Sequence, residues 1–154
     1  MQVSELSDAL LDLWVARAEG KRVRVIASNN YPYNDRDTEI FVRRCAETGY
    51  LSTPTIGLDS ISGGDRAEYS PSTDWAIGGP IIAREGIQIS PPESPVHRHG
   101  GPLAGWGESG LWTSTIFRKG PQRRCVQFDE KSPLVAAMRM YVASRYGKEV
   151  TDGI

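Results

Sequence analysis

Residues 69–82 read YSPSTDWAIGGPII, and this stretch carries opposing helix signals. The Ser-Thr-Asp run at 72–74 is rich in favoured N-cap residues and predicts that a helix begins there. The Gly-Gly-Pro run at 78–80 then falls within the second turn of that helix. Because Pro80 cannot donate to the carbonyl four residues back and disfavours helical geometry at Gly79, a helix over 74–85 is expected to be kinked or broken into two short pieces.

Such a break predicts a ligand-binding site. Unpaired N–H groups at a helix start bind anions well, and a neighbouring indole offers a flat face to a base or another ring. Arginine pairs with phosphate or carboxylate. We therefore predict a site for a small anionic, nucleotide-like ligand, with no catalytic residue, metal or cofactor. Its predicted residues are Ser72, Thr73, Asp74, Trp75, Gly78, Gly79, Ile81, Arg84 and Arg139.

A purely structural interpretation of the same stretch stays open. In it, the Ser-Thr-Asp run only caps the helix, Trp75 fills the core, and the two glycines let the segment cross the final helix at short range. The motifs of known phosphate-binding loops do not help to choose between the two interpretations, because the sequence has none of them. The stretch lacks the Gly-Lys-Ser/Thr ending of a Walker A loop, and the chain has no strand-GxGxxG-helix fingerprint.

Bulk composition limits the classes of function. The chain has 154 residues, of which 39% are hydrophobic and 24% charged, as in an ordinary single globular domain. Lys and Arg number 18 against 19 for Asp and Glu, so general nucleic-acid binding and attraction to an anionic membrane are disfavoured. Residues 1–20 are amphipathic and carry acidic residues, unlike a signal peptide, which predicts a cytoplasmic protein. Cys45 and Cys125 are expected to be reduced thiols.

Helix signals are clearest at the two ends of the chain. Ser4 is the predicted N-cap of a first helix that Gly20 ends, and a stripe of apolar residues along it predicts that Trp14 packs in the core. For the last helix, Ser132 is the predicted cap, Pro133 the first residue and Gly147 the stop. Leu134, Met138, Tyr141, Val142 and Arg145 form one stripe of that helix, which predicts a surface that packs on a sheet.

Strand signals lie between these helices. Residues 23–26, 87–90, 111–117 and 124–128 are rich in β-branched and aromatic residues and predict strands. Residues 38–48 fit either a short helix or a strand. Together the signals predict an α+β fold, in which a small, mainly antiparallel sheet is packed by the N- and C-terminal helices, with a Gly-Gly-Pro-interrupted helix beside them.

Two blocks of the sequence resemble a known family. YSPSTDWAIGGPIIAREGI (69–87) and SPLVAAMRMYVASRYG (132–147) are similar to the signature blocks of small phage proteins of unknown function called NinX, and the segment 18–20 matches in style. The resemblance implies a phage accessory protein of one domain over 1–154 and brings no catalytic residue. Two departures stand out. Ala83 replaces the usual acidic residue before Arg84, and an extra segment occupies about 27–66.

Phage accessory proteins often act on the host, so the resemblance favours capture of a small host nucleotide, such as an immune signal, in the host cytoplasm. A trap of this kind can place its pocket between the subunits of a homo-oligomer. One alternative is a protein-interaction module that inhibits or redirects a host enzyme through the 27–66 insertion and the Pro/Gly-rich loop at about 90–110. The other alternative is a nucleotide-processing enzyme, for which the sequence shows no catalytic base.

The pair His97 and His99 is the remaining candidate for site chemistry. On an extended strand the two imidazoles project to the same side, and with Cys45 or Cys125 they would begin a zinc site. Because the surrounding loop is rich in proline and glycine and no CxxC or HExxH motif accompanies it, a solvated pair is the favoured interpretation.

Overall fold

The computed structural model describes residues 1–27, 39–56, 67–92, 111–116 and 127–151, and the structural statements below concern these residues. The helices are a 3₁₀ turn η1 (Val3–Glu5), α1 (Asp8–Ala18), α2 (Trp75–Glu85) and α4 (Pro133–Tyr146). The strands are β1 (Arg22–Ala27), β2 (Glu39–Arg44), β3 (Thr55–Ile56), β4 (Ala67–Glu68), β5 (Ile87–Ser90), β6 (Trp112–Ile116) and β7 (Gln127–Glu130).

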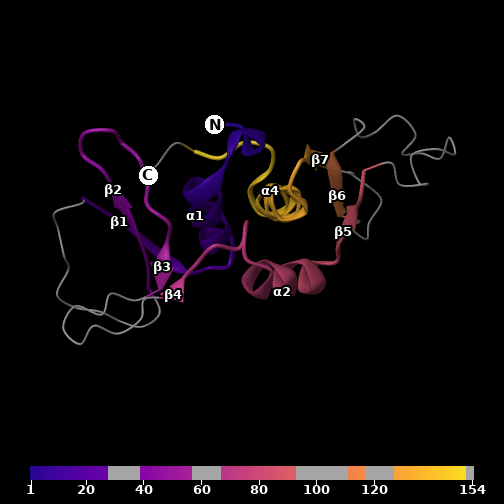
Figure 1. The fold of residues 1–154 in the computed structure, drawn as a ribbon, viewed down its shortest axis with the longest axis horizontal. Coiled ribbons are helices and arrows are strands. Elements are labelled where there is room, and N and C mark those ends of the chain that lie inside the picture. Colours follow the sequence, from indigo (N-terminus) through magenta and orange to yellow (C-terminus); the bar gives the residue numbers. More distant parts are fainter. Residues whose placement is uncertain (28–38, 57–66, 93–110, 117–126, 152–154) are drawn as a thin grey trace, which may run out of the picture.

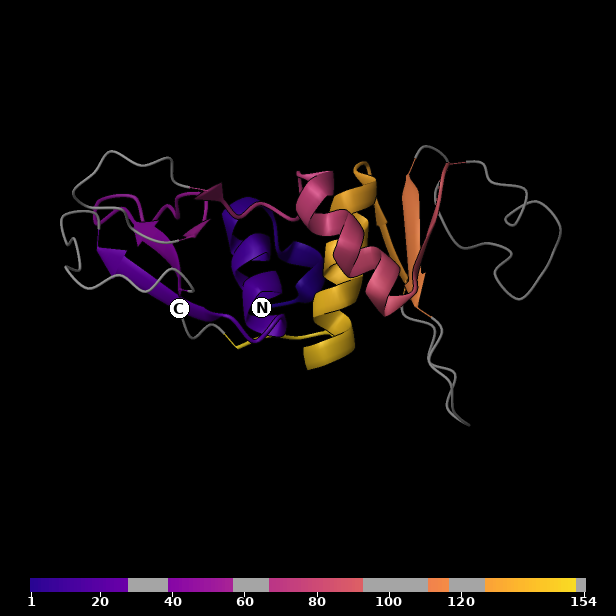
Figure 2. The same cartoon turned by 90° about the horizontal axis from the view of Figure 1, so that it is seen from below.

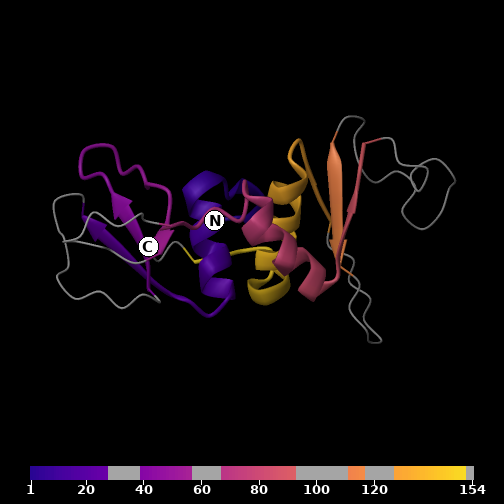
Figure 3. The same cartoon turned by 60° about the horizontal axis from the view of Figure 1, so that its bottom comes forward.

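The helices occupy the middle of the molecule, between two sheets. In Figures 1 and 2, the sheet of β1 to β4 lies beside α1, and the sheet of β5 to β7 lies beside α4. Helix α2 crosses α4 and leads into β5, as Figure 3 also shows. The predicted α+β fold is confirmed, with one difference. The strands form two sheets, because α1 and α4 stand between them and each sheet covers a different helix.

The first sheet resolves the ambiguous segment at 38–48, which forms strand β2. Its residues Ile40, Phe41 and Val42 are buried, as expected for β-branched and aromatic residues on a sheet. The strand order is β1-β2-β3-β4. The β1–β2 pair is parallel and the other two pairs are antiparallel, so this sheet is mixed.

The second sheet is antiparallel throughout, in the order β5-β6-β7. The strands predicted at 87–90 and 111–117 are present as β5 and β6, and β7 overlaps the strand predicted at 124–128, of which residues 124–126 lie outside the described residues. One buried hydrogen bond joins this sheet to the central helix, since the Ser114 hydroxyl donates to the Ala136 carbonyl at 2.7 Å. The register of α4 on the sheet is fixed by that bond.

The N-terminal helix begins later than predicted. Residues Val3–Glu5 form a 3₁₀ turn closed by Glu5, whose carboxylate accepts from the Gln2 amide at 3.0 Å. Helix α1 then starts at Asp8 with Ser7 as N-cap, so the assignment of Ser4 was wrong. The 3₁₀ turn is also bonded to the C-terminal part of the chain. The Val3 amide donates to the Lys148 carbonyl at 2.9 Å and thereby joins the two ends of the chain. Trp14 is buried in the core, as predicted.

The C-terminal helix has the predicted ends but a different environment. Ser132 accepts from the Val135 amide, Pro133 is the first residue, and Gly147 follows the last turn with φ +91°. The prediction of a single buried stripe was too narrow. Helix α4 is buried on most of its sides, and its buried residues include alanines outside the predicted stripe. A helix that is apolar nearly all round lies inside a protein, and α4 contacts α1, α2 and the second sheet. Its Arg145, predicted on the buried stripe, is exposed.

Helix α2 runs as one helix from Trp75 to Glu85 with Pro80 inside it, so the chain is not broken into two short helices here. Proline has no N–H to donate to the carbonyl of Ala76, but both ends of the helix are secured. At the start, the Asp74 carboxylate accepts from the Ala76 amide at 2.8 Å. At the end, Gly86 takes the left-handed conformation at φ +65°, which glycine adopts without strain.

The two glycines of α2 have different surroundings. A Cβ at Gly78 would lie 2.4 Å from the Pro71 carbonyl oxygen and 2.9 Å from Leu134 Cδ2, whereas one at Gly79 would meet only Trp75 at 3.9 Å. Gly78 therefore allows α2 to approach the preceding segment and α4 at short range. The structural interpretation of the sequence is confirmed for this residue.

We predict that Gly78→Ala lowers the free energy of unfolding by about 1–3 kcal/mol, because the new methyl group would overlap a backbone carbonyl that cannot move aside. Gly79→Ala is the matched control. It adds a methyl group in open space and gains up to ~1 kcal/mol of helix propensity. Urea unfolding of the two variants measures both, and equal effects would contradict the packing role of Gly78.

Candidate functional site

A cavity of about 310 Å³ lies where the end of α1 meets β3, the segment after β4, and α2. Its walls combine apolar side chains with two cations and one carboxylate. The lining residues are Glu19, Lys21, Ile56, Tyr69, Ala76, Ile77, Pro80, Ile81 and Arg84.

Helix α2 supplies more than half of this lining from one face. Ala76, Pro80 and Arg84 follow one another at intervals of four residues, and Ile77 and Ile81 form the adjacent row. Residues at such spacing share a face only if the helix is continuous. The unbroken course of α2 past Pro80 therefore creates this wall of the cavity.

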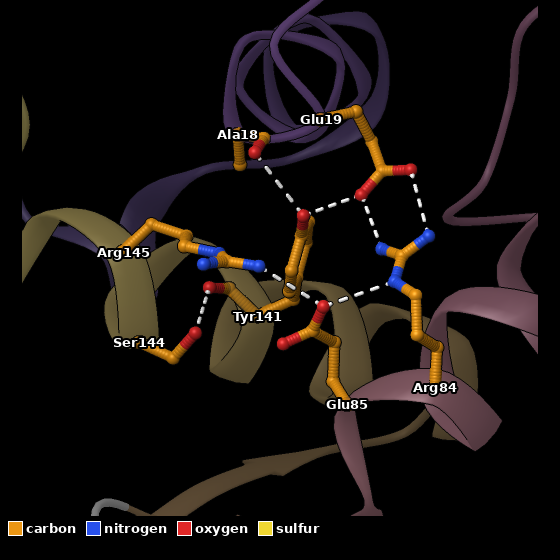
Figure 4. Close-up of polar contacts among 7 residues, drawn as sticks. All are labelled: Ala18, Glu19, Arg84, Glu85, Tyr141, Ser144 and Arg145. Carbon is orange, nitrogen blue, oxygen red and sulfur yellow. Dashed lines mark hydrogen bonds and ion pairs between the residues drawn. The ribbon is translucent and has the colours of Figure 1, made fainter.

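Arg84 is held by two carboxylates. Its Nη1 and Nη2 donate to Glu19 at 3.2 and 2.5 Å, and its Nε donates to Glu85 at 3.1 Å (Figure 4). Although burial raises the pKa of Glu19, hydrogen bonds from Arg84 and Tyr141 outweigh it and leave that pKa below its usual range. The pKa of Arg84 is raised, chiefly by Glu19. Both groups therefore remain charged.

The same network extends to α4. The Tyr141 hydroxyl donates to the Ala18 carbonyl at 3.1 Å and also contacts Glu19, while Arg145 donates to Glu85 at 3.0 Å (Figure 4). Burial, followed by the bond to Glu19, raises the pKa of Tyr141 to about 12, so this hydroxyl keeps its proton. The end of α1 is thus joined to α2 and α4 beside the cavity.

Lys21 and Tyr69 are the polar residues of the lining that this network leaves out. The Lys21 ammonium lies 5.6 Å from the centre of the Tyr69 ring and forms no ion pair within the described part of the chain. Tyr69 is only 3% exposed, and its buried hydroxyl has no hydrogen-bond partner among the described residues. Burial, with Glu19 and Asp12 adding to it, raises the pKa of Tyr69. Within the described residues, the cavity therefore has one cation that forms no ion pair and one buried hydroxyl without a hydrogen-bond partner.

The structure brings only two of the predicted site residues, Ile81 and Arg84, to this cavity. At the start of α2, three amides already have partners within the chain. The Asp74 carboxylate accepts from the Ala76 amide, and the Asp74 carbonyl accepts from Ile77 and Gly78 at 3.2 and 2.8 Å. These three N–H groups are therefore not free donors, and a ligand at this stretch stays a prediction.

Arg139, another predicted site residue, does not line the cavity either. It is only 8% exposed, its Nε donates to the Leu6 carbonyl at 2.8 Å, and its guanidinium pairs with Glu130. These contacts join the segment before α1 to β7, so Arg139 supports the core. Trp75 is 54% exposed and lines no described cavity, so the alternative that it fills the core was wrong as well. Thr73 and Gly79 likewise lie outside the cavity lining.

Sequence reasoning missed Glu19, Lys21 and Tyr69. Glu19 belongs to the segment 18–20 that resembled the phage family, and Tyr69 opens the stretch that defined the predicted site. The place of Glu19 and Tyr69 in these two segments was the signal that could have pointed to them. Nothing in the sequence marked Lys21 or Ile56, because both reach the cavity only through the folding of the first sheet against α1.

Other predicted chemistry falls mostly outside the described residues, which include neither His97, His99 nor Cys125. Cys45 has no disulfide partner. Within the described ranges, no three side chains of the metal-binding types gather at one place. None of the helices described in the structure has the length and apolarity needed to span a bilayer.

Comparison with known families agrees with the resemblance read from the two sequence blocks. A family model described as "Bacteriophage P22, NinX" matches residues 2–145. The chain belongs to this NinX family. Because the match extends from η1 into the last turn of α4, it includes every element that lines the cavity. No curated protein matches the chain.

Ser72 has a structural role in the NinX chain. It is buried, and its amide donates to the Asp12 carboxylate at 2.8 Å, which joins α1 to the segment that leads into α2. Asp12 is only 3% exposed. Burial raises the pKa of Asp12 to about 6, and hydrogen bonds from Ser72 partly offset that rise.

This buried carboxylate should make stability depend on pH. Between pH 3.8 and about 6 the folded protein holds a proton on Asp12 that the unfolded chain has lost, so stability falls as pH rises through this window. We predict that Asp12→Asn removes this component and stabilises the protein at pH 7 by about 1–3 kcal/mol. Glu47→Gln, in the exposed turn after β2, should leave the component intact. Urea unfolding from pH 4 to 7 tests both variants, and a slope unchanged in Asp12→Asn would refute the assignment.

Proposed function

We propose that this NinX protein is a non-catalytic phage accessory protein that binds and sequesters a small anionic, nucleotide-like host molecule. The binding site is the cavity between the end of α1 and α2. A host immune signal of nucleotide type would suit this role. The observation that carries the proposal is that one cavity is lined by Lys21, which forms no ion pair with the described residues, and by Tyr69, whose buried hydroxyl has no hydrogen-bond partner among them.

The lining suits a ligand with both a ring and a charge. Ile56, Ile77 and Ile81 provide apolar surface against which a base would be removed from water. The Tyr69 hydroxyl would donate to an oxygen or nitrogen of the ligand, which would relieve a buried donor of the cost of being unpaired. A volume of about 310 Å³ is at the small end of the range for ligand sites, about 300–1,000 Å³.

Capture without turnover is favoured by the state of the titratable groups. A general base works best when its pKa lies near the operating pH. The pKa of Glu19 is lowered and its carboxylate is bonded to Arg84, while the pKa of Tyr69 is raised. Neither group is suited to accept a proton from a substrate. The alternative of a nucleotide-processing enzyme would need a base from elsewhere.

A second candidate function, inhibition of a host enzyme by direct contact, has one observation in its favour. Tyr50, within the predicted insertion at 27–66, is 71% exposed, and exposed tyrosines are enriched in protein interfaces. If this function holds, pull-down from host lysate recovers one stoichiometric partner, and Tyr50→Ala weakens its recovery. A lysate that yields no such partner would count against this second candidate.

Isothermal titration with a panel of nucleosides, nucleotides and cyclic nucleotides tests the main proposal. We expect at least one anionic member to bind, and Lys21→Ala to weaken its binding at least tenfold, because a charge-assisted contact contributes about 1.5–3 kcal/mol. Lys131→Ala is the control, since it removes the same charge outside the cavity lining.

Two results would count against the proposal. One is the absence of heat across the whole panel, and the other is an equal loss of affinity in the two lysine variants. Mass analysis of the ligand after incubation then separates capture from turnover. Ligand recovered unchanged supports capture, whereas a product would favour the enzyme alternative.

A further inference from the structure

The charge of the cavity lining limits the charge of its ligand. Lys21 and Arg84 contribute two positive charges and Glu19 one negative charge, so the lining carries a net charge of about +1. The guanidinium of Arg84 is bound on one side by Glu19 and at its Nε by Glu85. Lys21 is therefore the cation that remains available to a ligand.

Glu19 is fixed in place as a charged group. It accepts from both terminal nitrogens of Arg84, and the Tyr141 hydroxyl contacts it from α4 (Figure 4). A carboxylate with these partners neither moves away nor takes up a proton near neutral pH. Any second negative charge on a ligand would face this carboxylate without a further free cation to offset it.

The size of the cavity suits a small ligand. About 310 Å³ accommodates one small ring system with the group attached to it. The Tyr69 hydroxyl adds one hydrogen-bond donor, which suits a phosphodiester or carboxylate oxygen or a ring acceptor.

We propose that the cavity selects a monoanionic ring compound of about the size of one nucleotide, such as a cyclic mononucleotide phosphodiester, and that Glu19 sets this charge preference. The inference rests on the proposed function and specifies its ligand class. Lys21 is the counter-ion of the single charge, and Glu19 excludes ligands that carry two or more charges.

Titration of the full chain with adenosine, adenosine 3′,5′-cyclic monophosphate, adenosine 5′-monophosphate and ATP, and with the guanine series, tests the inference at pH 7.5. In the better-bound series, the cyclic monoanion is expected to bind at least tenfold tighter than each of the other three compounds. Glu19→Gln raises the net charge of the lining from about +1 to +2. It is expected to shift the ratio of affinities toward the 5′-monophosphate by tenfold or more.

Glu85→Gln is the matched control. Glu85 is the other carboxylate partner of Arg84, but it does not line the cavity, so the ranking of the compounds should stay as in the wild type. Thermal unfolding of each variant reports whether it is folded. If Glu19→Gln does not fold, the order of affinities of the compounds for the wild-type protein alone tests the inference.

Tightest binding of ATP or the 5′-monophosphate to the wild type overturns the inference and leaves the proposed function standing. An equal shift of preference in the two glutamate variants also overturns it, because the effect would then come from a loosened Arg84. If no compound of either series binds, the proposed function fails together with the inference.

Discussion

The carboxylate of Glu19 is the contact on which the geometry of the cavity depends. It stands at the C-terminal end of α1 and accepts from Arg84 of α2 and Tyr141 of α4. Charged groups bonded in this way hold the helices in one relative position, because a shift of any one of them would leave a partly buried charge without its partner. The wall that α2 presents to the cavity is fixed by this contact, and so is the distribution of charge along it.

Close packing supplies the second constraint. Gly78 lets α2 lie against the Pro71 carbonyl and Leu134, and Asp12 holds the amide of Ser72 just before the helix begins. The contact of Gly78 lies on the side of α2 that packs into the protein, whereas Trp75 is exposed and the row Ala76, Pro80 and Arg84 lies at the cavity. One short helix therefore packs on α4 with one face and lines the cavity with another.

The sequence predicted best what is determined locally. The caps and stops of α4 depend on a few adjacent residues, and Ser132, Pro133 and Gly147 take the predicted places. Strand positions also followed from residue type. In contrast, the parallel pairing of β1 with β2 depends on contacts between separate segments, which periodicity does not report. The contacts of Arg139 could not be predicted for the same reason, because its acceptor, the Leu6 carbonyl, is 133 residues away in the chain.

The start of α2 and Arg84 show how the chain uses groups that attract anions. A helix start and an arginine are both favourable positions for an anion. The chain neutralises both with its own carboxylates, Asp74 at the helix start and Glu19 at Arg84. Lys21, which lies next to the Tyr69 ring, forms no ion pair with a carboxylate of the described residues. If a ligand binds as proposed, this cation sets its charge preference, because Arg84 is already paired with Glu19.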